Sequence, residues 1–283
     1  MSTTRTPHYD LHSHSTCSDG VLRPAELVER AAKRGVNALA LTDHDELSGL
    51  AEARAAADRC GIQLIPGVEI SVTWRGHTLH IVGLHVDPQS EVLVSGLNMN
   101  RAGRNERAVR IGEALERLGV PDALEGARSY VTNPNLVSRT HFARYLVATG
   151  WARNTQAVFD KFLGAGRPGY VEHDWTTLEE AVEWIAAAGG VSVLAHPGRY
   201  KLTEAQRDEL LGSFKDLRGF AIEVVTGSHA PDEFGYWARR AKQYGFFGSA
   251  GSDFHGLPDT YRDLGDLPPL PDGCTPVWQL FDA

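Results

Sequence analysis

Two histidines stand at alternate positions in the stretch DLHSHSTCSDG, which spans residues 10–20. His12 and His14 lie in a segment with strand character, so their side chains share one face, and Asp19 follows shortly after them. Neutral imidazole and carboxylate are the ligands of catalytic divalent metals such as zinc, manganese and iron. A lone HxH pair is more often a surface or core feature than a metal site, so its meaning depends on what accompanies it.

Further histidines and acids recur in the motifs TDHD, GVE, HTLHIVGL, AHPG, GSH and SDFH, each on or beside a predicted strand. The residues are Asp43, His44, Glu69, His80, His196, His229, Asp253 and His255. All except His80 stand at the C-terminal end of an apolar run. A purely structural explanation would require many buried charges that are satisfied separately, which is costly. The set therefore favours one metal site assembled from distant parts of the chain.

The elements that would position these residues are seven short apolar runs, each rich in β-forming or small residues and bounded by turn residues. They are residues 8–14, 37–45, 62–71, 77–86, 190–198, 220–229 and 246–255. Predicted helices separate several of them, at 24–35, 48–61, 177–190 and 203–214. Alternating strands and helices indicate an α/β fold with a mainly parallel sheet. Because strand carboxyl ends carry the active site in such folds, the seven runs predict a barrel with one polar mouth.

Local capping signals support three of these helices. Pro24 opens the first helix in its first turn, and the last two begin with the capping boxes Thr177–Glu180 and Thr203–Gln206. Ser48 is the candidate cap of the helix at 48–61.

The strand rhythm stops between about Leu97 and Trp175, where three helices are predicted, at 101–119, 140–150 and 155–164. We interpret residues 97–175 as a helical insertion over the barrel mouth, so that residues 1–96 and 176–283 form the barrel. Insertions of this kind commonly build substrate pockets or lids.

Composition narrows the class of protein. The 283 residues carry a formal net charge of −8, which argues against a general nucleic-acid binder but leaves room for a local basic pocket that binds a phosphorylated small molecule. The three cysteines imply no disulfide framework, and no apolar run is long enough to span a bilayer or to act as a signal segment. A cytoplasmic protein is expected, and the oligomeric state stays open.

Taken in order, these motifs resemble the PHP (polymerase and histidinol phosphatase) family of amidohydrolase-like metal-dependent hydrolases over nearly the whole chain. VSRTHFARYL (137–146) and FDKFLGAGRPGYV (159–171) are similar to insertion motifs of its 3′,5′-nucleoside bisphosphate phosphatases, whose relatives also trim short 5′-phosphorylated RNA. The resemblance implies a distorted seven-stranded β/α barrel with up to three divalent metal ions, Mn²⁺ first and Fe²⁺ or Zn²⁺ as alternatives. The implied reaction is removal of the 3′-phosphate, for example from 3′-phosphoadenosine 5′-phosphate.

The resemblance also implies which residues bind each metal. The first metal would take His12, His14, Glu69 and Asp253; the second would share Glu69 and take His80 and His196; the third would take Asp19, His44 and His255. Many relatives have a histidine at the position of Asp19. Asp43 would orient a ligand rather than bind metal. A metal-bridging water held by Glu69 would attack phosphorus, and His229 is a candidate general acid, although a packing role for it is equally open.

A bisphosphate needs a second anion pocket without metal, which arginine suits because its planar fork matches phosphate. Arg199 follows AHPG, and Ser138 and Arg139 begin the predicted helix at 140, where backbone N–H groups favour anions. Lys161 and Tyr170 are weaker candidates. For His141 a pocket role and a capping role are both open. The aromatic residues that could stack on a base are Trp74, Phe142 and Trp151, although core packing is more common for such residues.

Four arginines, Arg101, Arg104, Arg107 and Arg110, recur every three residues along one predicted helix. This stripe could face the pocket and guide a polyanion, but glutamates stand nearby in the sequence, so we expect a salt-bridged face exposed to solvent.

Two alternatives to a bisphosphate phosphatase stay open. The first is another phosphoesterase on the same metals, acting on histidinol phosphate or a cyclic nucleotide. The second is a non-catalytic metal-stabilised binding module, as in PHP domains attached to polymerases. The complete set of competent ligand residues argues against the second alternative.

Overall fold

The computed structural model describes residues 8–257 and 262–281 of the chain. Seven strands lie side by side in the order β1-β2-β3-β4-β6-β7-β8, and a short β5 pairs with β3 off this path. They are β1 (Tyr9–Asp10), β2 (Ala38–Leu41), β3 (Gln63–Trp74), β4 (His77–Leu84), β5 (Thr176–Thr177), β6 (Val191–Leu194), β7 (Ala221–Thr226) and β8 (Phe247–Gly251).

The first and last strands approach each other and nearly close the barrel. The N–H of Leu11 donates to the carbonyl of Ala250 at 2.9 Å, and a parallel bridge joins Ser13 to Phe254. The seven-stranded β/α barrel expected from the sequence is therefore confirmed, and its core is lined by small and branched residues such as Leu11, Ala40 and Ile65.

One strand runs against the others. β4 pairs antiparallel with both β3 and β6, whereas every other neighbouring pair is parallel. The first half of β4 therefore lies at the barrel end where the other strands finish. His80 lies opposite Ser71 in the register and so shares a face with Glu69, two residues earlier on β3. This explains why His80 is not at the end of its apolar run.

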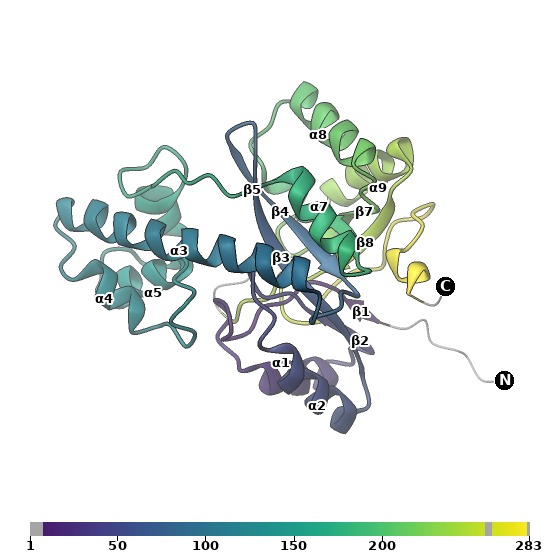
Figure 1. Cartoon of the computed structure of the whole chain (residues 1–283), viewed down its shortest axis with the longest axis horizontal. Coiled ribbons are helices and arrows are strands. Elements are labelled where there is room, and N and C mark those ends of the chain that lie inside the picture. The colour runs from purple at the N-terminus through teal and green to yellow at the C-terminus, as the bar shows by residue number, and fades with distance from the viewer. Residues whose placement is uncertain (1–7, 258–261, 282–283) are drawn as a thin grey trace.

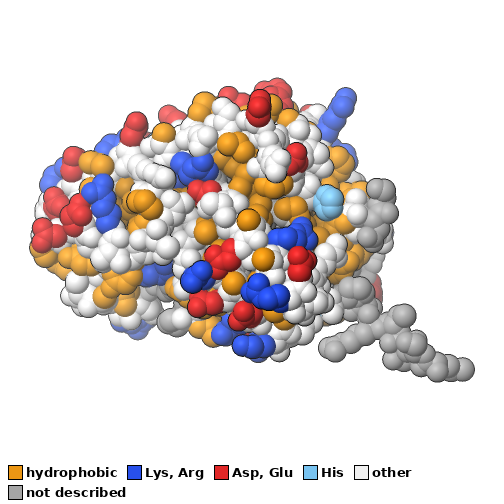
Figure 2. All heavy atoms as spheres, turned by 60° about the horizontal axis from the view of Figure 1, so that its bottom comes forward, with side chains coloured by type: hydrophobic (Ala, Val, Ile, Leu, Met, Phe, Trp, Pro, Cys, Tyr) orange, Lys and Arg blue, Asp and Glu red, His pale blue; other side chains and the backbone are white. Residues whose placement is uncertain are grey.

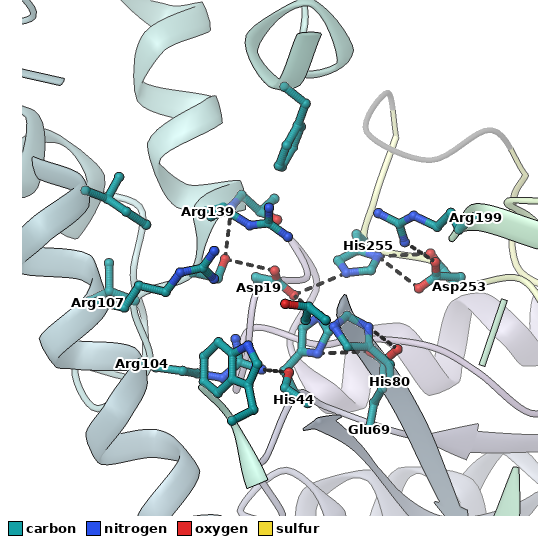
Figure 3. A pocket seen from close by; sticks show the side chains of 18 residues that line it. Asp19, His44, Glu69, His80, Arg104, Arg107, Arg139, Arg199, Asp253 and His255 are labelled. Carbon is teal, nitrogen blue, oxygen red and sulfur yellow. Dashed lines mark hydrogen bonds and ion pairs between the residues drawn. The ribbon is translucent and has the colours of Figure 1, made fainter. Parts of the chain in front are cut away.

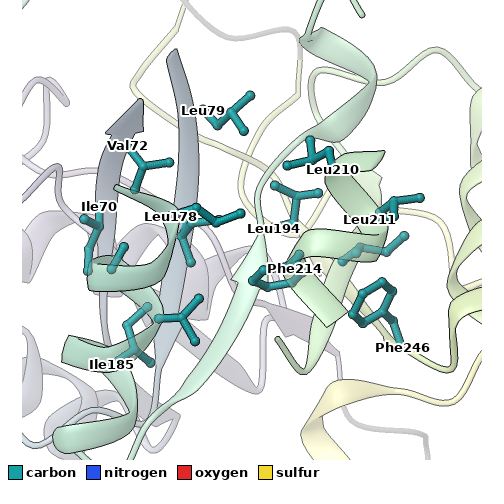
Figure 4. Close-up of a cluster of buried hydrophobic side chains, with 14 of the residues drawn as sticks. Ile70, Val72, Leu79, Leu178, Ile185, Leu194, Leu210, Leu211, Phe214 and Phe246 are labelled. Atoms are coloured by element: carbon teal, nitrogen blue, oxygen red, sulfur yellow. The ribbon is translucent and has the colours of Figure 1, made fainter. Parts of the chain in front are cut away.

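Five helices cover the outside of the barrel: α1 (Pro24–Lys33), α2 (Leu50–Cys60), α7 (Leu178–Ala187), α8 (Glu204–Asp216) and α9 (Glu233–Tyr244). In Figure 1, α1 and α2 lie on the opposite side of the strands from α7, α8 and α9. The apolar face of α7 and α8 packs on the sheet through residues such as Ile185, Phe214 and Leu194 (Figure 4).

Both predicted capping boxes are present, at Thr177–Glu180 and Thr203–Gln206. The predicted Ser48 cap is wrong, because Gly49 occupies the N-cap of α2 and no side chain caps that helix. Before the helix, the Glu46 carboxylate accepts hydrogen bonds from the N–H groups of Leu47 and Ser48 at 2.8 and 2.9 Å.

The segment after β4 is helical, with α3 (Glu91–Arg117), α4 (Ala123–Arg128), α5 (Arg139–Ala148), α6 (Thr155–Val158) and a π-helical turn at Phe159–Leu163. It has an apolar cluster of its own, which includes Ile111, Leu115, Phe142 and Leu146. α3 starts ten residues before the predicted helix and runs from the barrel out to α4 and α5 (Figure 1). The boundary at residue 97 therefore falls inside α3, and the division into two domains stays a prediction.

Within residues 8–257 and 262–281, no helix combines the length and the apolar character that crossing a bilayer requires. On the face shown in Figure 2, acidic and basic side chains are interspersed. Any anion-binding function must therefore come from a local site rather than from that face as a whole.

We predict that Gly96→Ala destabilises the fold, because a Cβ at this position of α3 would lie within 3.0 Å of the buried Trp184 ring on α7. Overpacking of this kind costs about 1–3 kcal/mol, which urea denaturation measures as a lower midpoint. Gly212→Ala in α8 is the matched control, since nothing lies within 4 Å of its Cβ position. That control is expected to be neutral or more stable, and equal losses in the two variants would contradict the packing of α3 on α7.

Candidate metal centre and anion pocket

All nine residues predicted as metal ligands converge at the barrel mouth. They form four overlapping groups whose ligand atoms lie within 4.8 Å of one another. The groups are His14, Asp19, His44 and His255; His12, His14 and Asp253; His12, Glu69 and His196; and His44, Glu69 and His80. Residues separated by up to about 240 positions in the sequence therefore meet, as the barrel geometry requires.

The first predicted group has the spacing of a tetrahedral metal site. His12 Nε2 lies 3.1 Å from His14 Nε2, 3.4 Å from Glu69 Oε2 and 3.5 Å from Asp253 Oδ1. His14 Nε2 lies 3.3 Å from the same two oxygens. Metal bonds of about 2.0–2.2 Å place tetrahedral donors roughly 3.3–3.6 Å apart, so the distances of the two histidines from each other and from the two carboxylates are close to those of a divalent-metal site.

Glu69 is the shared carboxylate of the cluster. Its Oε1 lies 2.8 Å from His80 Nδ1 and 3.0 Å from His196 Nε2, and its Oε2 lies 3.0 Å from His44 Nδ1. Burial alone would raise the pKa of this carboxyl, but the surrounding imidazoles of His80, His44 and His12 hold it well below its usual value. Glu69 therefore stays ionised and can bridge cations on both of its oxygens.

Asp19 completes a third group with His44 and His255. Its Oδ1 is buried and has no hydrogen-bond partner within the described residues, although it lies 3.3 Å from His255 Nε2 and 3.9 Å from His44 Nε2. Burial opposes its charge, but these two histidines lower its pKa well below the usual value. An ionised, buried oxygen without a donor fits a cation ligand.

The imidazoles of the cluster differ in their protonation. Burial lowers the pKa of His44 and of His196 to about 4, so both rings are neutral. Burial also disfavours charge on His14, but its hydrogen bonds to Asp253 and Glu69 raise its pKa to about 9. The buried carboxylates thus demand positive charge, which either protons on the rings or metal ions can supply.

The cavity above this cluster has a second wall, built by the insertion. Figure 3 shows Arg104, Arg107 and Arg139 on the side opposite Asp253 and His255. The cavity and its open mouth together enclose about 700 Å³ of space.

The solvent-exposed arginine stripe expected on α3 is wrong for Arg104 and Arg107, which are 7% and 6% exposed. Arg104 donates from Nε to Asp45 Oδ2 and from Nη2 to Ser71 Oγ, both at 2.7 Å. Arg107 donates from Nε to the Val171 carbonyl at 2.9 Å. The spacing matched a solvent face, but α3 lies across the barrel mouth, so this part of the helix is covered.

Arg107 and Arg139 have no carboxylate partner among the described residues. The described hydrogen bonds of their guanidinium groups go to backbone carbonyls, of Val171 and Leu163 respectively. Burial, reinforced by the charge of Arg139, lowers the pKa of Arg107 to about 9. Burial, with opposite contributions from Tyr170 and Arg199, lowers the pKa of Arg139 to about 10. Both remain charged at neutral pH, so this pair, the anion pocket, carries two uncompensated positive charges.

The PHP domain family model matches residues 10–227, which is most of the chain. The chain belongs to the PHP family. The resemblance inferred from the motifs is thereby confirmed. The PHP chain is 47% identical over 274 residues to the 3′,5′-nucleoside bisphosphate phosphatase of Chromobacterium violaceum, covering 97% of this chain and 96% of that protein. It is 44% identical over 276 residues to the 5′-3′ exoribonuclease Rnm of Escherichia coli, covering 97% of this chain and 94% of that protein.

Two solved structures agree with the fold of the PHP chain. An amidohydrolase from C. violaceum with bound sulfate and no metal matches at a TM-score of 0.94 and 46% identity, covering 97% of this chain and 96% of that one. A structure assigned as a metal-dependent phosphoesterase, from Bifidobacterium adolescentis, matches at a TM-score of 0.83 and 26% identity, covering 98% and 96%.

Of the other predicted substrate residues, two line the cavity and two do not. Arg199, half exposed at the rim, donates to Asp253 Oδ2 at 3.3 Å, and Ser138 caps α5. Tyr170 packs under the Arg107 guanidinium, 5.7 Å from ring centre to Cζ. Lys161 is exposed to solvent and is not part of the cavity wall. His141 takes the capping role, since its Nδ1 accepts from the Ser138 N–H at 3.0 Å.

His229 does not point a proton into the cavity. Its Nδ1 donates to the Val224 carbonyl at 3.2 Å, its Nε2 accepts from the Gly198 N–H at 2.9 Å, and its ring stacks on Trp237. The structure therefore does not support a general-acid role and fits the alternative, a packing histidine that supports the loop after His196.

Asp43 binds the loop that carries His14 and Asp19, as expected of an orienting residue. Its Oδ1 accepts from the Ser15 N–H at 2.8 Å and its Oδ2 from Ser15 Oγ at 2.6 Å. It belongs to none of the four ligand groups.

Sequence reasoning missed two residues of the site. Glu223 is buried and holds His12 Nδ1 at 2.7 Å and the N–H of His196 at 2.6 Å. An acid inside the apolar run AIEVVT was the available signal. Trp175 lines the cavity in place of the aromatics considered from the sequence, and Arg104 and Arg107 stack over its ring at 4.8 and 5.6 Å. Its buried indole N–H has no partner among the described residues.

We predict that Glu223→Gln lowers the affinity of the PHP chain for Mn²⁺ about 10- to 100-fold at the group containing His12, because loss of the charge weakens the orientation and basicity of that ring. Isothermal titration calorimetry of the metal-free protein measures the change. Glu125→Gln on the exposed surface of α4 is the control and should bind Mn²⁺ like the wild type. Unchanged affinity in Glu223→Gln would remove its role in positioning His12.

Proposed function

We propose that this chain is a metal-dependent phosphatase that removes the 3′-phosphate from nucleoside 3′,5′-bisphosphates. One observation carries the proposal: the anion pocket of Arg107 and Arg139 opens into the same cavity as the histidine–carboxylate cluster. A substrate with two phosphates would place one at the metals and the other at the arginines. Substrate charge would then compensate both halves of the cavity.

We propose that up to three divalent ions bind, with Mn²⁺ first and Fe²⁺ or Zn²⁺ as alternatives. The proposed ligands are His12, His14, Glu69 and Asp253 for the first; Glu69, His80 and His196 for the second; and Asp19, His44 and His255 for the third. The donor spacing around His12 and the unpartnered oxygen of Asp19 support this assignment. When bound, such ions supply Lewis-acid stabilisation of the phosphoryl oxygens and an activated water.

The residues of the chain itself orient the substrate. The anion pocket would bind the 5′-phosphate through charge-assisted hydrogen bonds, which fixes the distance of the 3′-phosphate from the metal cluster. Arg199 at the rim lies 3.3 Å from Asp253 and is placed to donate to the 3′-phosphate. The bound sulfate named for the related C. violaceum structure, an anion of phosphate-like shape, supports an anion site in this fold.

A second activity follows from the same arrangement. The relative in E. coli is named a 5′-3′ exoribonuclease, and a 5′-phosphorylated RNA end offers the anion pocket the same 5′-phosphate. We propose that short 5′-phosphorylated RNA is an additional substrate. A cytoplasmic location for this activity stays a prediction.

The alternative functions leave the anion pocket of the cavity without a role. Histidinol phosphate and a cyclic nucleotide each carry one phosphate, so the charge of the anion pocket would stay uncompensated. A non-catalytic module gives no reason for an open cavity between the metal ligands and two charged arginines.

The proposal is tested by phosphate release from 3′-phosphoadenosine 5′-phosphate in the presence of Mn²⁺, beside 5′-AMP and 3′-AMP, with metal-free protein as the blank. We expect fast release from the bisphosphate, slow release from both monophosphates and none without metal. Metal-dependent release that is equally fast from 3′-AMP would contradict the second phosphate site while leaving a phosphatase.

We predict that Arg107→Ala and Arg139→Ala each lower kcat/KM for the bisphosphate by roughly 10- to 150-fold, which corresponds to about 1.5–3 kcal/mol for a hydrogen bond to a charged group. The same variants should change kcat/KM for 3′-AMP by less than about threefold, because that substrate has no 5′-phosphate to lose. Arg128→Ala, an exposed arginine of α4, is the control. Equal losses on both substrates would show that the two arginines act on the metal cluster or on the fold.

A further inference from the structure

The two carboxylate oxygens of Asp19 have different surroundings. Oδ1 faces His255 and His44 and has no hydrogen-bond donor within the described residues, whereas Oδ2 accepts a hydrogen bond from Ser138 Oγ at 2.9 Å. Asp19 is 2% exposed and Ser138 is 6% exposed. A residue of the insertion therefore fixes a carboxylate of the third ligand group, 119 positions away in the sequence.

Ser138 is also the N-cap of α5, and its Oγ accepts from the N–H of Thr140 at 3.1 Å. The next residue, Arg139, belongs to the anion pocket. From the same helix, Arg144 donates to the backbone carbonyl of Asp19 at 2.7 Å. The first turn of α5 thus presents an arginine to the cavity while the helix holds Asp19 by its side chain and by its backbone.

We propose that Ser138 is a positioning residue that couples the third metal group to the anion pocket. Its hydroxyl donates a hydrogen bond to Oδ2 of Asp19, which leaves Oδ1 directed at His255 and His44. The same hydroxyl caps the first turn of α5, which carries Arg139. The inference rests on the proposed function, since it requires a metal at Asp19 and an anion at Arg139. The Ser138 hydroxyl donates to Asp19 and accepts from the Thr140 N–H, so Ser138 supports the two sites rather than binding phosphate directly.

Because coupling between two ligands is reciprocal, a metal at the third group should strengthen anion binding to the same extent as the anion strengthens the metal. Partners of ligating carboxylates typically change metal affinity by about 10- to 100-fold when they are removed. The expected loss in a variant without the Ser138 hydroxyl is of this size and is confined to one of the three metals.

The first experiment titrates metal-free protein with Mn²⁺ and follows free Mn²⁺ by electron paramagnetic resonance. Wild type should bind three equivalents of Mn²⁺. Asp19→Asn should lose the equivalent bound by the third group, which identifies it. Ser138→Ala should bind that equivalent about 10- to 100-fold more weakly and the other two normally, while Ser138→Thr, which keeps a hydroxyl, should bind all three. Ser90→Ala removes the capping serine of α3, which accepts from the Leu93 N–H, and controls for the loss of a cap.

Unchanged third-site affinity in Ser138→Ala, or an equal loss in Ser90→Ala, overturns the proposal. Only two equivalents in wild type would overturn it too, while a phosphatase acting with the first two groups would stand. Thermal unfolding of each metal-free variant identifies any variant that fails to fold. If Ser138→Ala fails to fold, the Mn²⁺ affinity of the third group in Ser138→Thr is compared with that in Asp19→Asn.

The second experiment measures binding of 5′-AMP by equilibrium dialysis with two and with three equivalents of Mn²⁺. In wild type the third equivalent should tighten binding, and in Ser138→Ala, compared at saturating Mn²⁺, that gain should disappear. An equal gain in the two proteins would show that Ser138 does not couple the sites.

Discussion

The buried carboxylate of Glu69 is the constraint on which the rest of the site depends. It is 1% exposed and lies within 3.4 Å of five imidazole rings, so in a region of low dielectric it must be matched by positive charge on every side. The barrel provides this by bringing the ends of distant strands together. β4 has to run antiparallel for His80 to reach the same carboxylate. The fold at the mouth is thus arranged around a charge that only cations can balance.

The insertion places positive charge on the facing wall of the cavity. Arg107 is buried and Arg139 half-buried, neither has a carboxylate partner within the described residues, and the two charges repel each other and their neighbours. α3 can hold Arg107 there because it is anchored at the barrel by Gly96 against Trp184 and by the Arg104–Asp45 pair, whereas Arg139 is held at the start of α5. Asp45 is fully buried and has a positive φ of 49°, a strained conformation for a non-glycine residue, and the bonds it makes to Arg104, Asn100 and Ser71 offset that cost. A cavity with candidate metal ligands on one wall and two arginines without a carboxylate partner on the other is suited to a molecule with two separated phosphates.

The convergence of most candidate metal ligands was predictable from the sequence, because ligand-type residues at the ends of apolar runs have few structural explanations. His80 could be placed only by family resemblance, since its position in the run makes sense only once β4 is known to be antiparallel. Arg104 and Arg107 were misjudged because an i, i+3 stripe with acids nearby looks the same on a solvent face and on a covered one. Trp175 was missed because a single residue in a linker has no local pattern, and Glu223 was missed although an acid inside an apolar run was a signal of it. His229 matched the chemistry of an acid, but its two nitrogens are engaged by backbone groups that no sequence pattern reveals.

The central claim is that metal ions and the 5′-phosphate occupy opposite walls of one cavity. A crystal structure of the protein with Mn²⁺ and 5′-AMP, with anomalous scattering used to locate manganese, tests it most directly. The account predicts anomalous peaks among His12, His14, Glu69 and Asp253, and phosphate density against Arg107 and Arg139. Phosphate density on the manganese ions with both arginines empty, or manganese outside the cluster, would contradict it.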